Sequence, residues 1–337
     1  MRRTVLFPAA ILCFLPLAAF ARGELLVGNK SDDTVWRLSL EDGRRLAEIA
    51  SAPGPHEIAV SPDGRTAIVT GYGHREPGNA LTVVALGDGS TRGITLGRHA
   101  RPHGVRFLPD GSALVTTERS HALLHVDPAT GGILREYHVG DGLGHMVALS
   151  RDGGVAYVSK IVAGTLVRVD LATGEVREAG AGRGAEGIEV APDGSVWVTN
   201  RAEDTVTVHD PDTLEKLATL SSPGFPIRVA FTTDGRHALV TNATAATLSV
   251  FDAASRVHVA TVALAPEGAP VHDTLLGRGA MPIGIAVDPD APRAYVAISG
   301  ANRIAVVDTA TWQVTGYWET GREPDALGIA AGTPERE

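Results

Sequence analysis

Short runs in which large apolar residues alternate with small or polar ones recur from residue 25 onward. In the first complete example, Ile58 and Val60 alternate with smaller neighbours, a Pro-Asp-Gly turn follows at 62–64, and a second apolar run occupies 67–70. A period of two indicates β-strands, and Asp-Gly between two such runs indicates a hairpin, because glycine accepts a positive φ. The turn position recurs at intervals of 47, 42, 41, 41 and 56 residues, at Asp63, Asp110, Asp152, Asp193, Asp234 and Asp290.

Each repeat continues with two further apolar runs, which predict a third and a fourth strand. After Asp110 these runs lie at 123–127 and 133–136. Four antiparallel strands in roughly every 40 residues are typical of a β-propeller blade. Residues 25–29 correspond to the second strand of a repeat, whereas 323–330 correspond to an isolated first strand. The sequence therefore predicts an all-β fold, a seven-bladed β-propeller of four-stranded antiparallel blades, whose C-terminal strand joins the N-terminal blade and closes the ring.

The first 21 residues have the pattern of a signal peptide. Arg2 and Arg3 precede an apolar run over 5–20, and Ala-Phe-Ala at 19–21 fits a cleavage site. We therefore expect a signal peptide over 1–21, a propeller over 22–331, a short tail over 332–337, and a periplasmic or secreted protein without stable membrane insertion after cleavage. The single cysteine, Cys13, lies within the signal, so disulfides and zinc–thiolate sites are not expected in the mature chain.

Composition and charge narrow the range of partners. The chain has 39 glycines and 20 prolines but only 5% aromatic residues, which agrees with short strands and tight turns. The formal net charge of −9 becomes −11 once the two arginines of the signal are removed (−9 − 2). A surface of this sign repels a phosphate backbone, so nucleic acid is not an expected partner.

Several short motifs resemble a known bacterial repeat. Val-Thr-Asn occurs at 198–200 and 240–242, Tyr-Val-Ser at 157–159, and Val-Asp-x-Ala-Thr-Gly at 126–131 and 169–174. These motifs resemble the YVTN-type seven-bladed β-propeller repeat of the YncE-like and surface-layer-like proteins. The resemblance covers the mature chain and implies the propeller fold. It implies little about function, because such propellers include surface-layer, DNA-binding, redox-associated and lactonase-related proteins.

One repeat position differs between blades in a way that suggests a site. Seven residues before the turn aspartate, three successive repeats carry His56, His103 and His145, and the next carries Glu186. This position begins the innermost strand, so in a propeller it lies near one mouth of the central channel. Imidazole and carboxylate suit a divalent metal such as zinc, copper, iron or nickel, so the four residues are candidate metal ligands. Strand alternation instead places them on the same side as Ile58, as packing residues between blades.

Two further features are candidate ligand contacts. Arg228 comes one residue after the position that carries the histidines in earlier repeats, and Arg106 lies in the same strand layer. The two arginines are therefore candidates for binding an anion, or alternatively for pairing with acidic side chains. The loop at 263–281 is longer than its counterparts and contains His272. Long loops on a rigid ring often carry binding specificity, although a tolerated surface insertion fits equally well.

These observations leave three functions open. The first is an exported binding module for a protein or small-molecule ligand, because nothing in the sequence assembles an evident nucleophile–base pair. The second is a metal-dependent lactonase- or lyase-like enzyme that uses the histidine and glutamate position, since a bound metal polarises a carbonyl or activates water. The third is an accessory protein of a periplasmic redox system.

Overall fold

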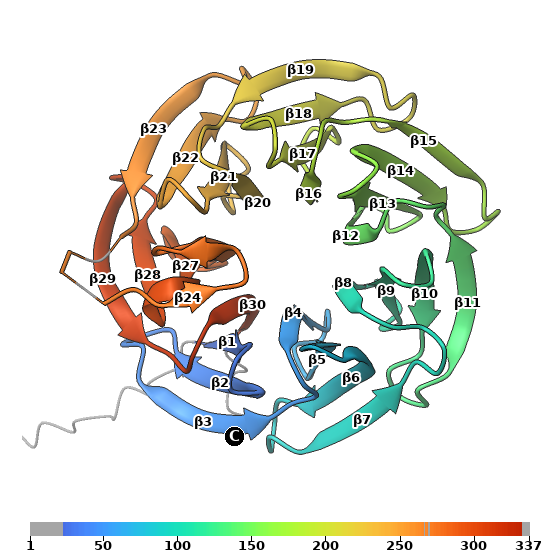
Figure 1. The fold of residues 1–337 in the computed structure, drawn as a ribbon, viewed down its shortest axis with the longest axis horizontal. Coiled ribbons are helices and arrows are strands. Elements are labelled where there is room, and N and C mark those ends of the chain that lie inside the picture. Colours follow the sequence, from blue (N-terminus) through green and yellow to red (C-terminus); the bar gives the residue numbers. More distant parts are fainter. Residues whose placement is uncertain (1–22, 266, 269, 332–337) are drawn as a thin grey trace, which may run out of the picture.

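The computed structural model describes residues 23–265, 267–268 and 270–331, so the predicted signal peptide and C-terminal tail lie outside the described residues. Seven four-stranded antiparallel sheets stand in a ring around a central channel (Figure 1). This arrangement confirms the predicted seven-bladed propeller. No helix in the described ranges is long and apolar enough to cross a membrane.

The blades are numbered along the chain, and their strands run from the channel outward. Blade 1 contains β30 (Pro324–Ala330), β1 (Glu24–Asn29), β2 (Thr34–Ser39) and β3 (Arg45–Ala50). Blades 2 and 3 contain β4 (Pro55–Val60), β5 (Thr66–Gly73), β6 (Pro77–Ala85) and β7 (Thr91–Thr95), then β8 (Pro102–Phe107), β9 (Ala113–Thr117), β10 (Ala122–Val126) and β11 (Ile133–His138). Blade 4 contains β12 (Gly144–Leu149), β13 (Val155–Lys160), β14 (Thr165–Asp170) and β15 (Val176–Gly180).

The second half of the ring repeats the plan. Blade 5 contains β16 (Ala185–Val190), β17 (Val196–Asn200), β18 (Thr205–His209) and β19 (Lys216–Ser221). Blade 6 contains β20 (Pro226–Phe231), β21 (His237–Asn242), β22 (Thr247–Asp252) and β23 (His258–Ala263). Blade 7 contains β26 (Pro282–Val287), β27 (Arg293–Ile298), β28 (Arg303–Asp308) and β29 (Gln313–Glu319), with a short 3-10 helix, η1 (Ser299–Ala301), after β27.

The hydrophobic core lies between neighbouring blades rather than within them. Trp197 and Val208 of blade 5, for example, join Val229 and Phe251 of blade 6 in one buried cluster. Alternation along each strand supplies these contacts, because side chains of one parity face the preceding blade and those of the other parity face the next. The channel is therefore surrounded by seven inner strands whose positions are fixed by packing.

Ring closure follows the prediction. β30 pairs antiparallel with β1, with Leu25 opposite Ile329, so the last strand completes the first blade. A buried ion pair between Lys30 Nζ and Asp325 Oδ2, 2.6 Å apart, adds a side-chain contact across this join. Because β30 completes blade 1, the N-terminal blade has no unpaired inner edge.

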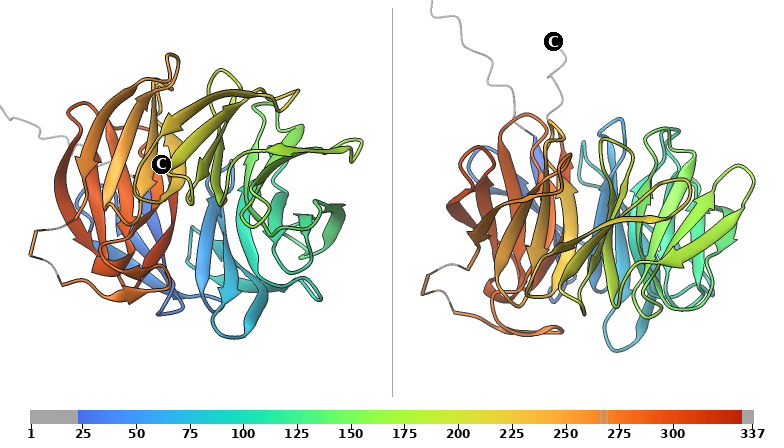
Figure 2. Two further views of the ribbon diagram at one scale, coloured as in Figure 1. Left: turned by 45° about the horizontal axis from the view of Figure 1, so that its top comes forward. Right: turned by 90° about the horizontal axis from the view of Figure 1, so that it is seen from above.

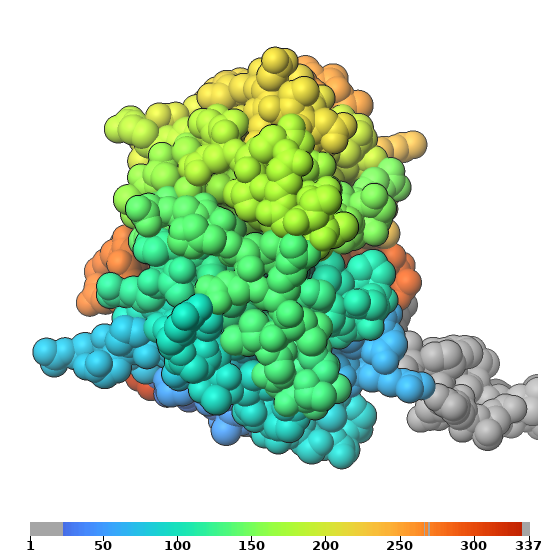
Figure 3. Space-filling model, turned by 90° about the vertical axis from the view of Figure 1, so that its right-hand side faces the viewer, coloured from blue at the N-terminus to red at the C-terminus, as the bar shows by residue number. Residues whose placement is uncertain are grey.

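The ring has two different faces. The upper face is the end at which the inner strands begin, and it also carries the loops between the second and third strands of each blade. Two insertions project from it: the long β5–β6 hairpin, and a long loop after β23, which contains β24 (Asp273–Thr274) paired with β25 (Gly277–Arg278). This face points to the bottom of the right-hand view in Figure 2 and to the left in Figure 3. The lower face carries the Asp-Gly turns that defined the repeat in the sequence.

The chain enters every inner strand through a left-handed residue. The residue before each inner strand has a positive φ between 51° and 73°, namely Gly54, Arg101, Leu143, Gly184, Phe225, Met281 and Glu323. Five of these are not glycine, although this conformation costs an L-residue roughly 1–2 kcal/mol. The same turn in all seven blades sets the residues that follow at one level around the channel mouth.

Candidate functional site

The inner strands bring the position predicted from the repeats into a single ring. Following the blades from 1 to 7, its members are Asp325, His56, His103, His145, Glu186, Ile227 and Ile283. A register irregularity interrupts the pairing of each inner strand beside this position, for example between Pro55 and Ile58 in blade 2. Such bulges alter the direction of side chains locally. His56 and His103, at the same position of neighbouring blades, are in contact, which also agrees with a packing role between blades.

The three histidines contact one another around the mouth. The ring centroids of His56 and His103 lie 4.2 Å apart at an interplanar angle of 90°, and those of His103 and His145 lie 3.6 Å apart at 38°. The Tyr72 ring stacks on His56, with centroids 4.7 Å apart, and also meets His103 edge-on at 5.6 Å. Residues from blades 2, 3 and 4 thus form one continuous buried arc.

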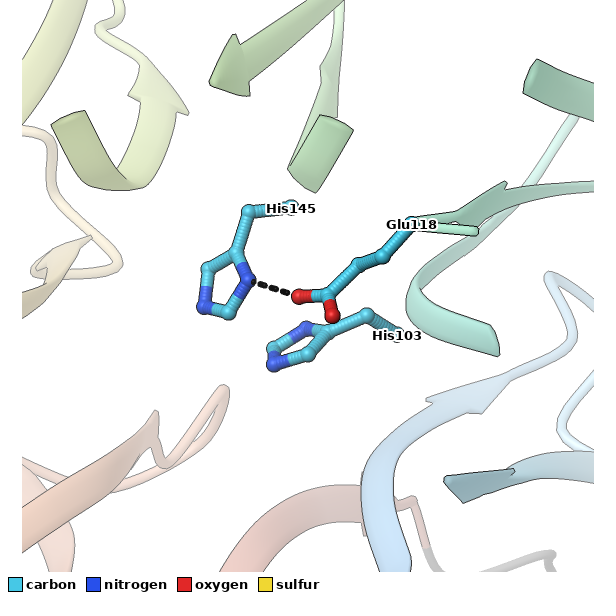
Figure 4. A group of neighbouring side chains, drawn as sticks. All are labelled: His103, Glu118 and His145. Atoms are coloured by element: carbon cyan, nitrogen blue, oxygen red, sulfur yellow. Dashed lines mark hydrogen bonds and ion pairs between the residues drawn. The ribbon is translucent and has the colours of Figure 1, made fainter. Parts of the chain in front are cut away.

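A second ring of residues, at the end of the second strand of each blade or just after it, lies against the first. Its members are Lys30, Tyr72, Glu118, Ile161, Arg201, Ala243 and Ser299. Tyr72 donates a hydrogen bond to Glu118 Oε2 at 2.6 Å, and Glu118 Oε1 lies 2.7 Å from His145 Nδ1 (Figure 4). The sequence analysis missed this ring because it compared only the position before the turn aspartate. The same repeat alignment, applied to the end of the second strand, would have placed Tyr72 and Glu118 at equivalent positions of neighbouring blades.

His145 lies between two carboxylates. Its Nδ1 bonds Glu118 and its Nε2 lies 2.9 Å from Glu186 Oε1. Burial by itself lowers the pKa of His145, but Glu186 and Glu118 outweigh it and raise that pKa to about 9. Burial raises the pKa of Glu186, yet His145, Arg228 and Arg201 lower it to about 2. These shifts favour a protonated imidazole held between two ionised carboxylates.

Arg228 crosses the channel from blade 6. Its Nη2 lies 2.6 Å from Glu57 Oε1 of blade 2, and its Nη1 lies 3.3 Å from Glu186 Oε1 of blade 5. Burial lowers the pKa of Arg228, but the two glutamates raise it well above its ordinary value. A second cross-channel pair, Arg106 to Glu189 at 3.1 Å, lies nearer the lower face. An internal cavity of about 90 Å³ is lined by both arginines together with Glu57 and Glu189, among apolar neighbours. Both arginines are thus paired with acids.

His103 differs from its neighbours because its polar atoms have no partner. Its side chain is fully buried, and neither Nδ1 nor Nε2 makes a hydrogen bond within the described part of the chain. Burial lowers the pKa of His103 well below its ordinary value, with His145 and His56 adding to this effect, so its imidazole is neutral. One nitrogen of His103, one nitrogen of His145 and one oxygen of Glu118 lie within 4.8 Å of one another, which makes these three a possible metal-binding group.

The remaining predicted ligands lie at different places. Glu186 and Arg228 belong to the same buried network, and His56 stands at its edge beside Asp325, whose Oδ2 lies 3.0 Å from His56 Nδ1 in poor alignment for a hydrogen bond. His272 is exposed in the inserted loop, where its backbone N–H donates to the carbonyl of Gly300. The structure thus brings five of the six predicted residues together and leaves His272 outside the cluster.

Blades 6 and 7 give the mouth a different character. Ile227 and Ile283 of the first ring, with Ala243 of the second, form a buried apolar cluster with Met281. Phe225 and Leu276 pack against this cluster, and Leu276 comes from the β24–β25 hairpin of the inserted loop. The mouth therefore has a polar arc over blades 1 to 5 and an apolar sector over blades 6 and 7.

The comparisons with known proteins bear on the fold. No family model and no curated protein matches the chain. Among solved structures, it is similar to a protein of unknown function from Desulfotomaculum acetoxidans DSM 771 (TM-score 0.75, 17% identity, 92% of this chain and 99% of that one). It is also similar to virginiamycin B lyase from Staphylococcus aureus (0.69, 15%, 83% and 92%) and to hydrazine synthase from Kuenenia stuttgartiensis (0.65, 17%, 90% and 99%). At these identities the likeness shows a shared fold alone, and the resemblance to the YVTN-type repeat stays a prediction.

Proposed function

We propose that this chain is an exported binding propeller that holds a divalent transition metal at the upper mouth of its channel, with His103, Glu118 and His145 as ligands. The observation that carries the proposal is the unpartnered imidazole of His103. Buried polar groups in folded proteins are almost always hydrogen-bonded, and an orphaned one calls for a water or an ion. Here the orphan lies within reach of a second imidazole and a carboxylate.

The donor set favours a particular class of metal. Two imidazole nitrogens and one carboxylate oxygen suit zinc, copper, nickel or iron better than magnesium or calcium, which prefer oxygen ligands. Both ring nitrogens of His145 now face carboxylates, so coordination through His145 requires one proton to leave. A metal held by His103, Glu118 and His145 would supply the positive charge that the proton takes away, which would keep the buried carboxylates compensated.

Titration calorimetry with zinc chloride at pH 7.5, together with elemental analysis of the purified protein, tests this proposal. We expect zinc binding to weaken by at least about 100-fold in His103→Gln, more than changes outside the ligand shell usually cost. The matched control is His209→Gln, because His209 is also buried but lies in β18, away from the mouth. Absence of any bound metal, combined with no heat from zinc, copper, nickel or manganese, would contradict the metal site.

One feature supports a second candidate, a metal-dependent lyase- or lactonase-like enzyme. Tyr72, Glu118, His145 and Glu186 form a chain of hydrogen bonds of 2.6–2.9 Å that runs through two of the proposed metal ligands, Glu118 and His145. Such a chain is able to accept or deliver a proton beside a metal-bound substrate. The two candidates separate in one measurement: incubation of the zinc-loaded protein with lactones consumes an enzyme's substrate, whereas a binding module returns it unchanged.

A further inference from the structure

The boundary between the polar arc and the apolar sector is occupied by Arg201. This residue is the blade 5 member of the second ring, and its Nη1 lies 2.6 Å from Glu186 Oε2. Of the three guanidinium nitrogens of Arg201, only Nη1 has a hydrogen-bond partner among the described residues. The side chain of Arg201 is 29% exposed. The rest of the fork is therefore available to a ligand. A guanidinium edge offers two parallel donors, which match the two oxygens of a carboxylate.

The other side of Arg201 is apolar. Its guanidinium carbon lies 5.1 Å from the centre of the Phe225 ring, in a cation–π contact. Phe225 has a φ of +68°, so the turn into β20 holds this large side chain against Arg201 in spite of backbone strain. Phe225 and Leu276 in turn pack on the buried cluster of Ile227 and Ile283. A molecule bound to the free edge of Arg201 would have an apolar wall beside it.

Two strongly exposed apolar side chains also lie in loops of the upper face. Leu275 at the tip of the β24–β25 hairpin is 81% exposed, and Val162 in the loop after β13 is 72% exposed. They are the two most exposed large apolar residues among those described. The other eight lie on or beside outer strands of the blades. A partly free arginine beside Phe225, on a face that also carries exposed apolar groups, indicates a ligand with both an anionic and an apolar part.

From these contacts we propose that the mouth takes up a small monocarboxylate with an apolar chain. The carboxylate bonds the free edge of Arg201, and the chain lies along Phe225, Leu276 and Leu275, beside the metal ligands of blades 3 and 4. A single negative charge fits better than a polyanion, because one guanidinium edge is free and the chain carries a formal net charge of −9. The inference rests on the proposed function in that both place the ligand in this mouth.

Calorimetry with zinc-saturated protein and sodium octanoate as the probe tests the inference. Octanoate should bind at least tenfold more tightly than acetate, which lacks the chain, and at least tenfold more tightly than octanamide, which lacks the charge. Arg201→Gln should weaken octanoate binding at least tenfold, and Arg201→Lys should restore part of the loss. Leu276→Ser should weaken octanoate but leave acetate unaffected. The control is Arg183→Gln, since Arg183 is exposed on the same face and paired with Glu203.

The outcomes separate this inference from the proposal on which it rests. If zinc binds and octanoate does not, or if Arg201→Gln and Arg183→Gln bind octanoate equally well, the carboxylate inference is wrong and the metal site stands. If zinc does not bind but octanoate binds in an Arg201-dependent manner, the metal site is wrong and the carboxylate site stands. Circular dichroism and melting curves of each variant establish that a lost signal reflects the site rather than unfolding.

Discussion

Replacing Arg228 by methionine should destabilise the fold more than any other single charge removal at the channel. The side chains of Arg228 and Glu57 are 8% and 11% exposed, and their nearest atoms are 2.6 Å apart. Methionine keeps the apolar stem of the side chain but leaves the Glu57 carboxylate buried without its cation, and removes one of the cations on Glu186. Breaking a buried pair in this way costs about 3–5 kcal/mol. That loss is a large fraction of a typical unfolding free energy of about 5–15 kcal/mol.

Urea unfolding followed by tryptophan fluorescence at pH 7 measures this loss. The matched control is Arg106→Met, because the pair of Arg106 with Glu189 also crosses the channel but is 31% and 27% exposed. Solvent screening should limit that loss to about 1 kcal/mol. The double variant Arg228→Met/Glu57→Gln should recover at least half of the lost stability, since the uncompensated charge is gone. If Arg228→Met costs no more than Arg106→Met, the reasoning about buried charge in this channel is refuted.

Three other predictions follow from the ring and its mouth. Deleting residues 323–337 removes β30 and leaves blade 1 without its inner strand, so the protein should aggregate or melt much lower; an unchanged melting curve would show that the ring does not depend on this strand. A Cβ at Gly284 would lie 1.9 Å from the carbonyl oxygen of Asp325, whereas one at Gly316 in the same blade meets nothing within 4 Å, so Gly284→Ala should cost about 1–3 kcal/mol in urea unfolding and Gly316→Ala almost nothing. The free energy of unfolding should also depend on pH. The raised pKa of His145 stabilises the fold fully below 6.5, the pKa of this group in the unfolded chain, and the contribution is lost as the pH rises toward about 9. The lowered pKa of Glu186 stabilises the fold fully above 4.5, and this contribution is lost as the pH falls toward about 2. Unfolding free energies measured from pH 4 to 9 should therefore fall above pH 6.5, and equal slopes for the native chain and His145→Gln would contradict the assignment.

The fold could be predicted because its signals are local and repeated. Period-two alternation and the turns at Asp63 and its equivalents specify the strands and hairpins, and their spacing specifies the blade. Ring closure was also predictable, since a second strand at one end of the chain and a first strand at the other have no partners except each other. The repeat alignment likewise placed His56, His103 and His145 at one level of the channel.

The chemistry of the mouth was decided by tertiary structure. The pairing of β8 shifts register beside His103, and only the closed ring brings Glu118 of one blade, His145 of the next and Glu186 of the third into hydrogen-bonding distance. Arg228 illustrates the same limit, because its partner Glu57 is 171 residues away and lies on the opposite side of the channel. Sequence alone determined which residue stands at each repeat position, since strands and turns depend on neighbours in the chain. Which of those residues are paired, and which is left without a partner, depends on the distances across the channel, and these are fixed only when seven blades pack into a ring.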